Sequence, residues 1–477
     1  MLQIRKYNEA YLLITGERSE EQELSDYFTF NIPNARFQPK FRAGLWDGKI
    51  RIYNTKTKLI YYGLLENIIE FCNQKEIKYE LLNTSLDTEY SLHEFREFYN
   101  NLSLPFEPRD YQEESVVNCI RKSRLTLLSP TASGKSFIIY LLTRFYNRKT
   151  IIIVPTTSLI HQMSSDFEQY GYTEPVHKIF SRQEKDSNHN ITVATWQSLY
   201  KMPKKWFDQF EVCIVDECHL AKAQSLTKIM TNLDKCKYRF GFTGTLDGTQ
   251  TNKMVIEGLF GPILNVITTS KLIEEKHLAE FKIKCIVLNY SDDRKKIAKQ
   301  YSYQDEIEFI VGNKKRNNFI KNLALSLKGN TLVLFQFVEK HGQILYDMIK
   351  DSTDRDVYFI HGQIDGKDRD DIRKIVENKT DCIIIASSQT FSTGINIRSL
   401  ENIIFSSPSK SRIKTLQSIG RVLRKSEQKT KSQLFDIADN LSWKSKKNYT
   451  ILHFLERLKI YNQEKFPYKT YNVELEK

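Results

Sequence analysis

Hydrophobic and polar residues follow one pattern in the first 100 residues of the chain and another beyond them. In the first part, alternating apolar and polar positions, as in 49–53, predict short strands. Apolar residues three or four apart over 64–72 predict a helix, and 77–82 predict a further strand. The dipeptide Asp47-Gly48 between alternating segments predicts a hairpin turn. Residues 1–100 are therefore expected to form a small α+β domain.

Beyond residue 100 the predicted strands are short, almost entirely apolar, and separated by longer segments with helical spacing. They are expected at 125–128, 150–154, 212–215, 331–335, 382–386 and 403–405. Continuous apolar strands between helices are typical of parallel sheets covered on both faces. A polar, charged stretch near 292–316 separates these strands into two groups. We expect two α/β domains in tandem, 101–270 and 271–442, and then a helical extension, 443–477, whose last residues lack a clear pattern.

Charge and cysteine content narrow the class of protein and its partners. Among 477 residues, 71 Lys and Arg against 58 Asp and Glu give a net charge of +13. Such a charge favours an acidic partner, most commonly nucleic acid, although it can serve solubility alone. The 7 cysteines include no Cys-x-x-Cys pair, which favours a reducing compartment and no zinc site. No signal-peptide pattern or apolar run of about 18 residues occurs, so we expect a cytoplasmic protein without a membrane partner.

Residues 129–136, Ser-Pro-Thr-Ala-Ser-Gly-Lys-Ser, lie between an apolar strand and an apolar helix. This is the context of a phosphate-binding loop, whose backbone N–H groups point at anionic oxygens. In such a loop Lys135 reaches the β- and γ-phosphates and the Ser136 hydroxyl ligates Mg²⁺. The other loop residues expected to bind the nucleotide are Thr131, Ser133 and Gly134. Ser129 stands where the pattern has its first glycine, and an exposed turn is the alternative.

An acidic pair, Asp216-Glu217, follows the apolar strand 212–215 directly. A phosphate-loop enzyme places its Mg²⁺ ligand at the carboxyl end of such a strand. Asp216 is expected to hold the metal through water and Glu217 to activate the attacking water. The alternative is an ordinary helix start, where acidic residues are favourable. The hydroxyl residues Thr243 and Thr245 end another short strand and could link the acidic pair to movement after γ-phosphate leaves; a plain turn is the alternative.

Two arginines in the second half of the chain, Arg421 and Arg424, are three residues apart and hence on one helix face. Guanidinium groups that face a phosphate site act as arginine fingers and stabilise transition-state charge. An isolated pair with this spacing is usually solvated. It gains weight here because the predicted phosphate site otherwise has no arginine.

Four segments occur in an order that resembles the motifs of superfamily 2 helicases. They are Asp-Glu-Cys-His at 216–219, Thr-Gly-Thr at 243–245, Ser-Thr-Gly-Ile-Asn at 392–396 and Gln-x-x-Gly-Arg-x-x-Arg at 417–424. Within that superfamily, segments 41–51, 130–136, 303–307 and 315–317 resemble recombination and repair helicases of bacteriophages. The resemblance covers nearly the whole chain. It implies two RecA-like domains, ATP and Mg²⁺ as cofactors with ATP in the cleft between these domains, and action in the host cell cytoplasm.

The resemblance also implies roles for single residues. Segment 106–112 resembles the adenine-reading motif, with Gln112 on the base. Segments 154–159 and 195–198 resemble strand-contacting motifs of the first domain. The residues expected to contact nucleic acid are Thr156, Thr195 and Gln197 in the first domain and Thr393 in the second. Gly394 is expected beside the nucleotide.

Lys40, Arg42 and Trp46 lie in a basic, aromatic stretch of the N-terminal domain. They could bind phosphates and stack on bases of nucleic acid. The alternative is a hairpin whose aromatic side chains face the core and whose charges are solvated.

The resemblance implies a nucleic-acid-stimulated ATPase that unwinds or branch-migrates branched DNA in recombination and repair. Its substrates would be forks, Holliday junctions and R-loops, which contain RNA–DNA hybrids, and the chain would act as a monomer. A double-strand translocase without strand separation and an RNA helicase share the same motifs and stay as alternatives. The non-enzymatic alternative is a nucleotide-gated binding module. That alternative gives no role to the catalytic base Glu217, the metal ligand Asp216 or the two arginines.

Overall fold

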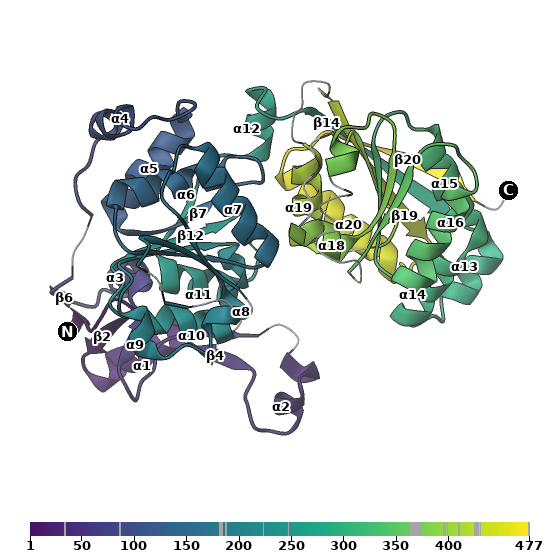
Figure 1. The fold of residues 1–477 in the computed structure, drawn as a ribbon. Helices are drawn as coiled ribbons and strands as arrows, with labels where there is room; N and C mark the ends of the chain where they lie inside the picture. Colours follow the sequence, from purple (N-terminus) through teal and green to yellow (C-terminus); the bar gives the residue numbers. More distant parts are fainter. Residues whose placement is uncertain are drawn as a thin grey trace. The chain divides into compact units, whose positions relative to one another are not determined.

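The computed structural model describes residues 1–32, 35–84, 87–180, 185–186, 188–222, 224–246, 248–362, 372, 374–394, 397, 399–408, 411–423, 429 and 431–475. The chain divides into two compact units (Figure 1). The first comprises Met1–Ser129 and Gly134–Ile267, and the second comprises Thr268–Lys477 together with Pro130–Ser133. Within the described part of the chain, no helix combines the length and the apolar sequence needed to cross a bilayer.

The first unit begins with a small mixed sheet in the order β5-β2-β1-β6. Strand β1 pairs antiparallel with β2 and parallel with β6, and α3 supplies buried Ile68 and Phe71 to the core. The predicted α+β domain and its helix are confirmed. The elements are β1 (Leu2–Lys6), β2 (Tyr11–Thr15), α1 (Arg18–Tyr27), β3 (Thr29–Asn31), η1 (Ala35–Phe37), α2 (Pro39–Arg42), β4 (Lys49–Arg51), β5 (Leu59–Tyr61), η2 (Tyr62–Leu64), α3 (Leu65–Gln74) and β6 (Tyr79–Leu82).

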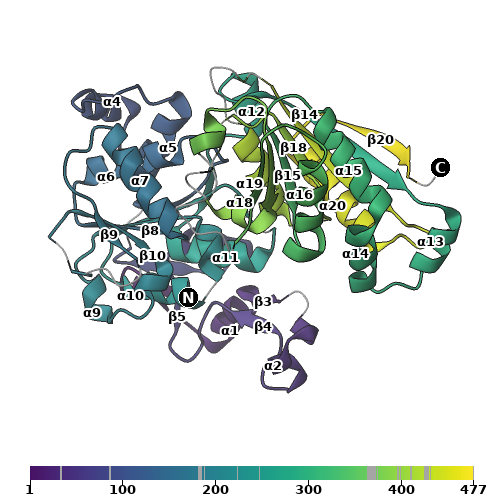
Figure 2. The same cartoon turned by 45° about the vertical axis from the view of Figure 1, so that its right-hand side comes forward.

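The predicted hairpin turn at Asp47-Gly48 is wrong. Strands β3 and β4 do pair antiparallel, but residues 32–48, including α2, lie between them. Figure 2 shows α2 at the far end of the segment that joins β3 to β4, which we call the projection. The Asp47 carboxylate accepts the Lys49 N–H at 3.1 Å and pairs with Arg51 at 2.5 Å, so it fixes the start of β4. The dipeptide therefore begins a strand instead of joining two.

The rest of the first unit is built on a parallel sheet, which has seven strands among the described residues. Their order is β13-β7-β12-β11-β8-β10-β9. Successive residues of β8 point to opposite faces. Ile152 and Val154 therefore join one hydrophobic core, and Ile151 and Ile153 join the other. The strands are β7 (Arg124–Leu128), β8 (Thr150–Val154), β9 (His177–Ile179), β10 (Ile191–Thr195), β11 (Val212–Asp216), β12 (Tyr238–Thr243) and β13 (Ile263–Asn265).

Helices cover both faces of this sheet, as the continuous apolar strands predict. They are α4 (Leu92–Asn100), α5 (Asp110–Lys122), α6 (Lys135–Tyr146), α7 (Thr157–Gln169), α8 (Trp196–Leu199), α9 (Lys204–Phe207), η3 (Cys218–Lys222), α10 (Gln224–Asn232) and α11 (Gln250–Phe260). Phe95 of α4 lies in the same core as α5 and α6. The boundary predicted at residue 100 stays a prediction, but α4 packs with the α/β part.

The second unit holds another seven-stranded parallel sheet, in the order β16-β17-β15-β18-β19-β14-β20 among the described residues. Its strands are β14 (Glu280–Asn289), β15 (Thr331–Phe335), β16 (Val357–Ile360), β17 (Ile383–Ser387), β18 (Asn402–Phe405), β19 (Lys431–Asn440) and β20 (Tyr468–Glu474). Its helices are α12 (Thr269–Glu274), α13 (Asp292–Ala298), α14 (Tyr303–Gly312), α15 (Lys314–Ser326), η4 (Val338–Gly342), α16 (Gln343–Lys350), α18 (Ser388–Gly394), α19 (Arg412–Val422) and α20 (Tyr449–Gln463).

The end of the chain is not the patternless tail that the sequence suggests. After α20, β20 adds an edge strand parallel to β14, with Ile283 paired to Tyr468. Most side chains of β20 are exposed. An edge strand whose two faces are largely exposed to solvent needs no apolar face. The hydrophobic pattern of the sequence therefore does not reveal β20.

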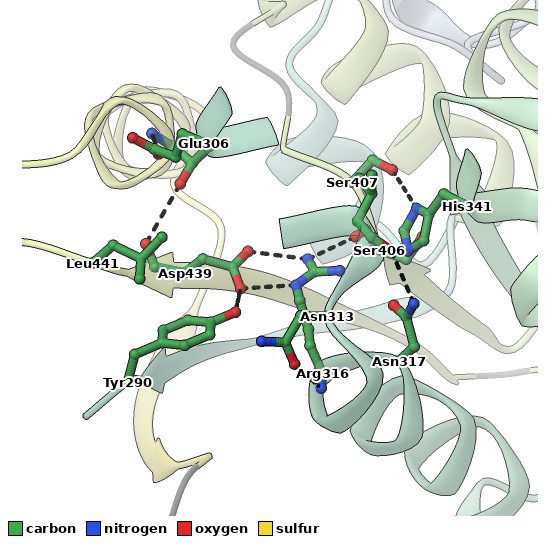
Figure 3. A network of polar contacts seen from close by, with 12 residues as sticks. Tyr290, Glu306, Asn313, Arg316, Asn317, His341, Ser406, Ser407, Asp439 and Leu441 are labelled. Carbon is green, nitrogen blue, oxygen red and sulfur yellow. Dashed lines mark hydrogen bonds and ion pairs between the residues drawn. The ribbon is translucent and has the colours of Figure 1, made fainter. Parts of the chain in front are cut away.

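Buried charges tie the helices of the second unit to its sheet (Figure 3). The Arg316 guanidinium, on α15, donates to both oxygens of Asp439 on β19, at 2.8 and 3.0 Å, and to the carbonyl of Ser406 at 2.8 Å. Tyr290 donates its hydroxyl to the same carboxylate at 2.8 Å. Burial, together with the Arg316 charge, lowers the pKa of nearby His341 to about 3, so this imidazole is neutral. This network fixes the carboxyl end of β19.

The N-terminal domain docks on α11 through a close approach of two backbones. A Cβ atom at Gly63, in η2, would lie 2.0 Å from the Glu257 carbonyl oxygen and 2.8 Å from that of Gly258. Beside it, Arg124 of β7 pairs with Glu9 at 2.9 Å and lies 3.9 Å from the Tyr62 ring centroid. The contact combines steric fit with a largely buried ion pair.

Gly63→Val is expected to lower the midpoint of thermal unfolding by roughly 4 °C or more, because the added side chain has no space at this contact. Differential scanning calorimetry measures the midpoint. Gly312→Ala is the matched control, since no atom lies within 4 Å of its added Cβ. Equal midpoints for the two variants would contradict the close contact.

Candidate functional site

The predicted phosphate loop joins β7 to α6, which begins at Lys135 as the sequence predicts. Ala132 and Gly134 have φ values of +68° and +81°, a conformation that turns the backbone sharply. Within the loop the Lys135 ammonium donates to the Ser129 carbonyl at 3.2 Å. Ser129 itself is buried, and its N–H donates to the Thr243 carbonyl at 2.8 Å. A serine therefore fits where the strict pattern has glycine.

Gln112, near the start of α5, lies directly behind this loop. Its side chain is buried, and its amide oxygen accepts the Arg109 N–H at 3.0 Å. A Cβ atom at Gly134 would come within 2.3 Å of the Gln112 amide nitrogen. Gly134 is favoured by its positive φ, and its lack of a side chain leaves room for the Gln112 amide. The structure brings Gln112 to the loop that carries Lys135.

The acidic pair stands at the carboxyl end of β11 and connects to the end of β12. Asp216 accepts the Glu217 N–H at 2.9 Å, and Glu217 has a φ of +54°. The His219 Nδ1 lies 3.1 Å from the Glu217 carboxylate and 2.9 Å from the Thr243 hydroxyl oxygen. Because that hydroxyl donates to the Thr245 carbonyl at 2.9 Å, its oxygen accepts from His219, which places the proton on Nδ1. His219 thus links Glu217 to the Thr-Gly-Thr segment.

Electrostatics at this pair favour a bound cation. Burial and the adjacent Glu217 charge raise the pKa of Asp216 to about 6, while Lys135 and His219 act in the opposite direction. A divalent cation would relieve the repulsion between the two carboxylates. Among the described residues, no group of three or more His, Cys, Asp or Glu side chains forms a metal cage. Mg²⁺ usually binds one or two carboxylates together with phosphates and water, so it needs no such cage.

Ser136, the predicted Mg²⁺ ligand, shares a hydrogen bond of 2.9 Å with the Tyr170 hydroxyl. Tyr170 follows α7 and packs edge-on against Phe106 and Phe137, with ring centroids 5.7 and 5.0 Å away. Phe106 is 51% exposed beside the loop. Sequence reasoning missed Tyr170, because no motif or spacing marks it. His219 was within the Asp-Glu-Cys-His segment and could have been found there.

The predicted strand-contacting residues of the first unit lie at the ends of neighbouring strands. Thr195 ends β10, in register with Val154 of β8, and Thr156 follows β8. Gln197 donates to the Pro155 carbonyl at 3.3 Å. Thr195 and Thr156 therefore share one edge of the sheet, although the Thr195 hydroxyl is largely buried.

The predicted residues of the second unit are described only in part. Arg421 lies on α19, with its guanidinium 5.6 Å from the ring centroid of buried Phe391 on α18. Arg424 lies outside the described residues. Thr393 and Gly394 end α18, and their side-chain surroundings lie outside the described part as well.

The basic stretch of the N-terminal domain is exposed. Lys40 and Arg42 lie on α2 and face solvent, and Trp46 is half-buried, donating to the Lys49 carbonyl at 2.8 Å. Phe37 and Phe41 of the same stretch are 57% and 37% exposed. These two rings do not fill a core, and the Arg36 guanidinium lies 4.9 Å from the Phe37 ring centroid.

Three comparisons bear on this geometry. Residues 2–82 match the family "DNA helicase UvsW, N-terminal", 105–248 match "Type III restriction enzyme, res subunit" and 314–426 match "Helicase conserved C-terminal domain". The chain is 36% identical to the ATP-dependent DNA helicase uvsW of Enterobacteria phage T4 over 99% of its length and 100% of that protein. The chain belongs to the UvsW family of superfamily 2 helicases. The predicted family is confirmed, and with it an ATP-hydrolysing helicase.

Two further likenesses frame this UvsW-family helicase. The crystal structure of T4 UvsW matches it with a TM-score of 0.53 and 33% identity, over 100% of both chains. The DNA 3′-5′ translocase XPB2 of Sulfurisphaera tokodaii is 31% identical over 41% of this chain and 45% of that protein. The predicted pair of RecA-like domains behind a small N-terminal domain is confirmed.

Proposed function

We propose that this UvsW-family helicase uses ATP hydrolysis to unwind or branch-migrate forks, Holliday junctions and R-loops, acting as a monomer. The observation that carries the proposal is the convergence of Lys135, Asp216 and Glu217 at one sheet edge in a chain that matches T4 UvsW from end to end. The match includes the N-terminal domain, whose exposed basic projection suits a branched polyanion.

Hydrolysis follows from the residues around the phosphate loop. Lys135 and the loop N–H groups would bind the phosphates, while Gln112 would read the base. Ser136 and Asp216 would hold Mg²⁺, which neutralises charge developing on the phosphate oxygens. Glu217 would take the proton of the attacking water. The His219 Nδ1 lies 3.1 Å from that carboxylate and would help to orient it.

Movement would arise from the link between the hydrolytic base and Thr243. When the γ-phosphate leaves, the charges around Glu217 change, and His219 passes the change to the Thr-Gly-Thr segment at the end of β12. Thr156, Thr195 and Gln197 would hold one strand through its backbone, and Thr393 would do so in the second unit. Backbone contacts carry no sequence information, so the grip would not depend on sequence. Arg421 and Arg424 would act as arginine fingers and stabilise charge on the transferred phosphate.

The decisive experiment measures ATP hydrolysis with single-stranded DNA, duplex, fork, four-way junction and RNA side by side. We expect forks and junctions to stimulate most, and a labelled fork to be displaced. Stimulation by RNA alone would overturn the proposal in favour of an RNA helicase.

A double-strand translocase is the second candidate, because one relative, XPB2, is named as a translocase. It would displace a triplex strand without opening a fork. Strand displacement from the fork in the same experiment separates the two candidates.

Replacing both Lys40 and Arg42 by Ala is expected to weaken fork and junction binding and to reduce the salt slope of log K by about two. Both side chains are exposed, so stability should not change. Fluorescence anisotropy at several salt concentrations measures the slope. Lys56→Ala with Lys75→Ala, exposed lysines of the same domain, is the control. Identical slopes for both double variants would show that the projection does not bind DNA.

A further inference from the structure

A second basic surface lies in the second unit, and it contains none of the site residues predicted from the sequence. It consists of the exposed residues Arg294, Lys296 and Lys299, on and after α13, and Lys444, Lys446 and Lys447, between β19 and α20. We call it the lysine patch. Strands β14 and β19 pair in parallel up to Asn289 and Asn440, so the two segments leave the same edge of the sheet. They touch, since Lys446 donates to the Lys299 carbonyl at 2.5 Å.

The charge of the lysine patch exceeds that of an ordinary solvated surface. Residues 291–300 and 443–448 hold seven Lys and Arg against two acids, Asp292 and Asp293. Those acids lie 3.5 and 3.4 Å from Lys295 and Lys296. The segment 443–448 contains three lysines and no acid. A net excess of five positive charges from two short segments is a strong local field for a polyanion.

The backbone that carries these lysines is fixed. Trp443 and Lys446 exchange two N–H···O bonds of 3.1 Å, and Lys296 lies 5.3 Å from the centroid of the Trp443 ring system. At the base of the segment, buried Glu306 accepts the Asn448 amide at 2.8 Å and the Thr450 N–H at 2.7 Å. Figure 3 shows Glu306 close to the end of β19 that Arg316 holds. The lysines are therefore presented on a rigid support.

Lys444 occupies a position that glycine would fill with less strain. Its φ is +51°, in the left-handed region that disfavours a side chain, and it stands at the tip of the Trp443–Lys446 turn. This conformation closes the turn between Trp443 and Lys446, and it leaves the Lys444 side chain exposed at the tip. The side chain is the part that a ligand would use.

We propose that the lysine patch binds the phosphate backbone of duplex DNA and so gives the second unit a duplex contact beside its helicase motifs. This rests on the proposed function. The patch offers ammonium groups for phosphates, and its Trp443 ring is half-buried under Lys296, which restricts stacking of unstacked bases on that ring. Phosphate contacts alone suit a duplex, whose bases are already stacked.

Lys444→Gly tests the proposal, because glycine relaxes the backbone while removing the charge. Duplex binding should weaken, and the salt slope of log K should fall by about one. The thermal midpoint should stay equal or rise, and the hydrolysis rate at saturating DNA should not change. Lys465→Gly is the matched control: it is exposed in the same unit, has a φ of +56°, and lies beyond the other end of α20.

Equal duplex affinities and salt slopes for Lys444→Gly and Lys465→Gly would overturn the proposal. An equal loss of affinity for single strands and duplex would overturn the assignment to duplex. Failure of the proposed function would give a different result, because hydrolysis by the wild-type protein would then not respond to any DNA. If only the lysine-patch proposal fails, wild-type hydrolysis still responds to DNA, and Lys444→Gly binds duplex as tightly as Lys465→Gly.

Discussion

Lys135→Ala is expected to abolish DNA-stimulated ATP hydrolysis and to leave DNA binding largely intact. The Lys135 ammonium lies inside the phosphate loop, 3.2 Å from the Ser129 carbonyl, and its charge acts on Asp216. Without Lys135, the β- and γ-phosphates lose their contact with a lysine ammonium. The transition state then lacks the main positively charged side chain that this unit supplies. The proposed DNA contacts do not belong to the loop: Thr195 ends β10, and Thr156 follows β8 and precedes α7.

Two measurements on one preparation check this prediction. Phosphate release with and without a fork gives the stimulated rate, and anisotropy with the same fork gives the affinity. Lys201→Ala, an exposed lysine of the same unit, controls for general loss of charge. Stimulated hydrolysis that survives in Lys135→Ala would contradict the role of the loop. Loss of fork binding to the same extent would instead show that Lys135 supports the DNA contacts.

Several strands of both large sheets, among them β7, β8, β11, β15, β17 and β18, could be predicted because a parallel sheet covered on two faces favours apolar side chains along the strand. Residues 150–154 and 331–335 carry that signal, and both are buried throughout. Strand β20 could not be predicted, since its exposed side chains follow no apolar pattern. The turn at Asp47-Gly48 failed for another reason. The Asp47 carboxylate accepts a backbone N–H of the following strand. The sequence of a dipeptide does not show which backbone group its side chain will bind.

Within the site, the sequence identified groups whose chemistry is tied to a local motif. Lys135 begins α6 after the loop and Asp216 ends β11, so neither prediction needed knowledge of distant contacts. Contacts between distant segments could not be foreseen in the same way. Tyr170 reaches Ser136 across 34 residues, and Gly63 meets α11 almost 200 residues away. Both depend on tertiary packing, which hydrophobic spacing does not encode.

Arg421→Ala is expected to lower DNA-stimulated hydrolysis by about 10³-fold or more, if Arg421 acts as an arginine finger. A finger stabilises charge that develops in the transition state, so its loss affects turnover more than the binding of ATP. Arg421 sits on α19 with its guanidinium beside the Phe391 ring, a contact that restricts its motion. Nucleotide affinity should change little, because Lys135 and Gln112 belong to the other unit.

Single-turnover hydrolysis at saturating ATP and fork DNA measures the loss of rate in Arg421→Ala. Arg421→Lys keeps a positive charge but loses the planar fork that binds phosphate oxygens in pairs, so an intermediate rate is expected. Lys459→Ala, an exposed residue of α20 paired with Glu456, removes a charge from the same unit without touching the site and should keep the full rate. A tenfold drop in Arg421→Ala would be too small for a finger. Such a small drop would mean that another positively charged residue stabilises the transition state. Arg424→Ala would then be the next variant to measure.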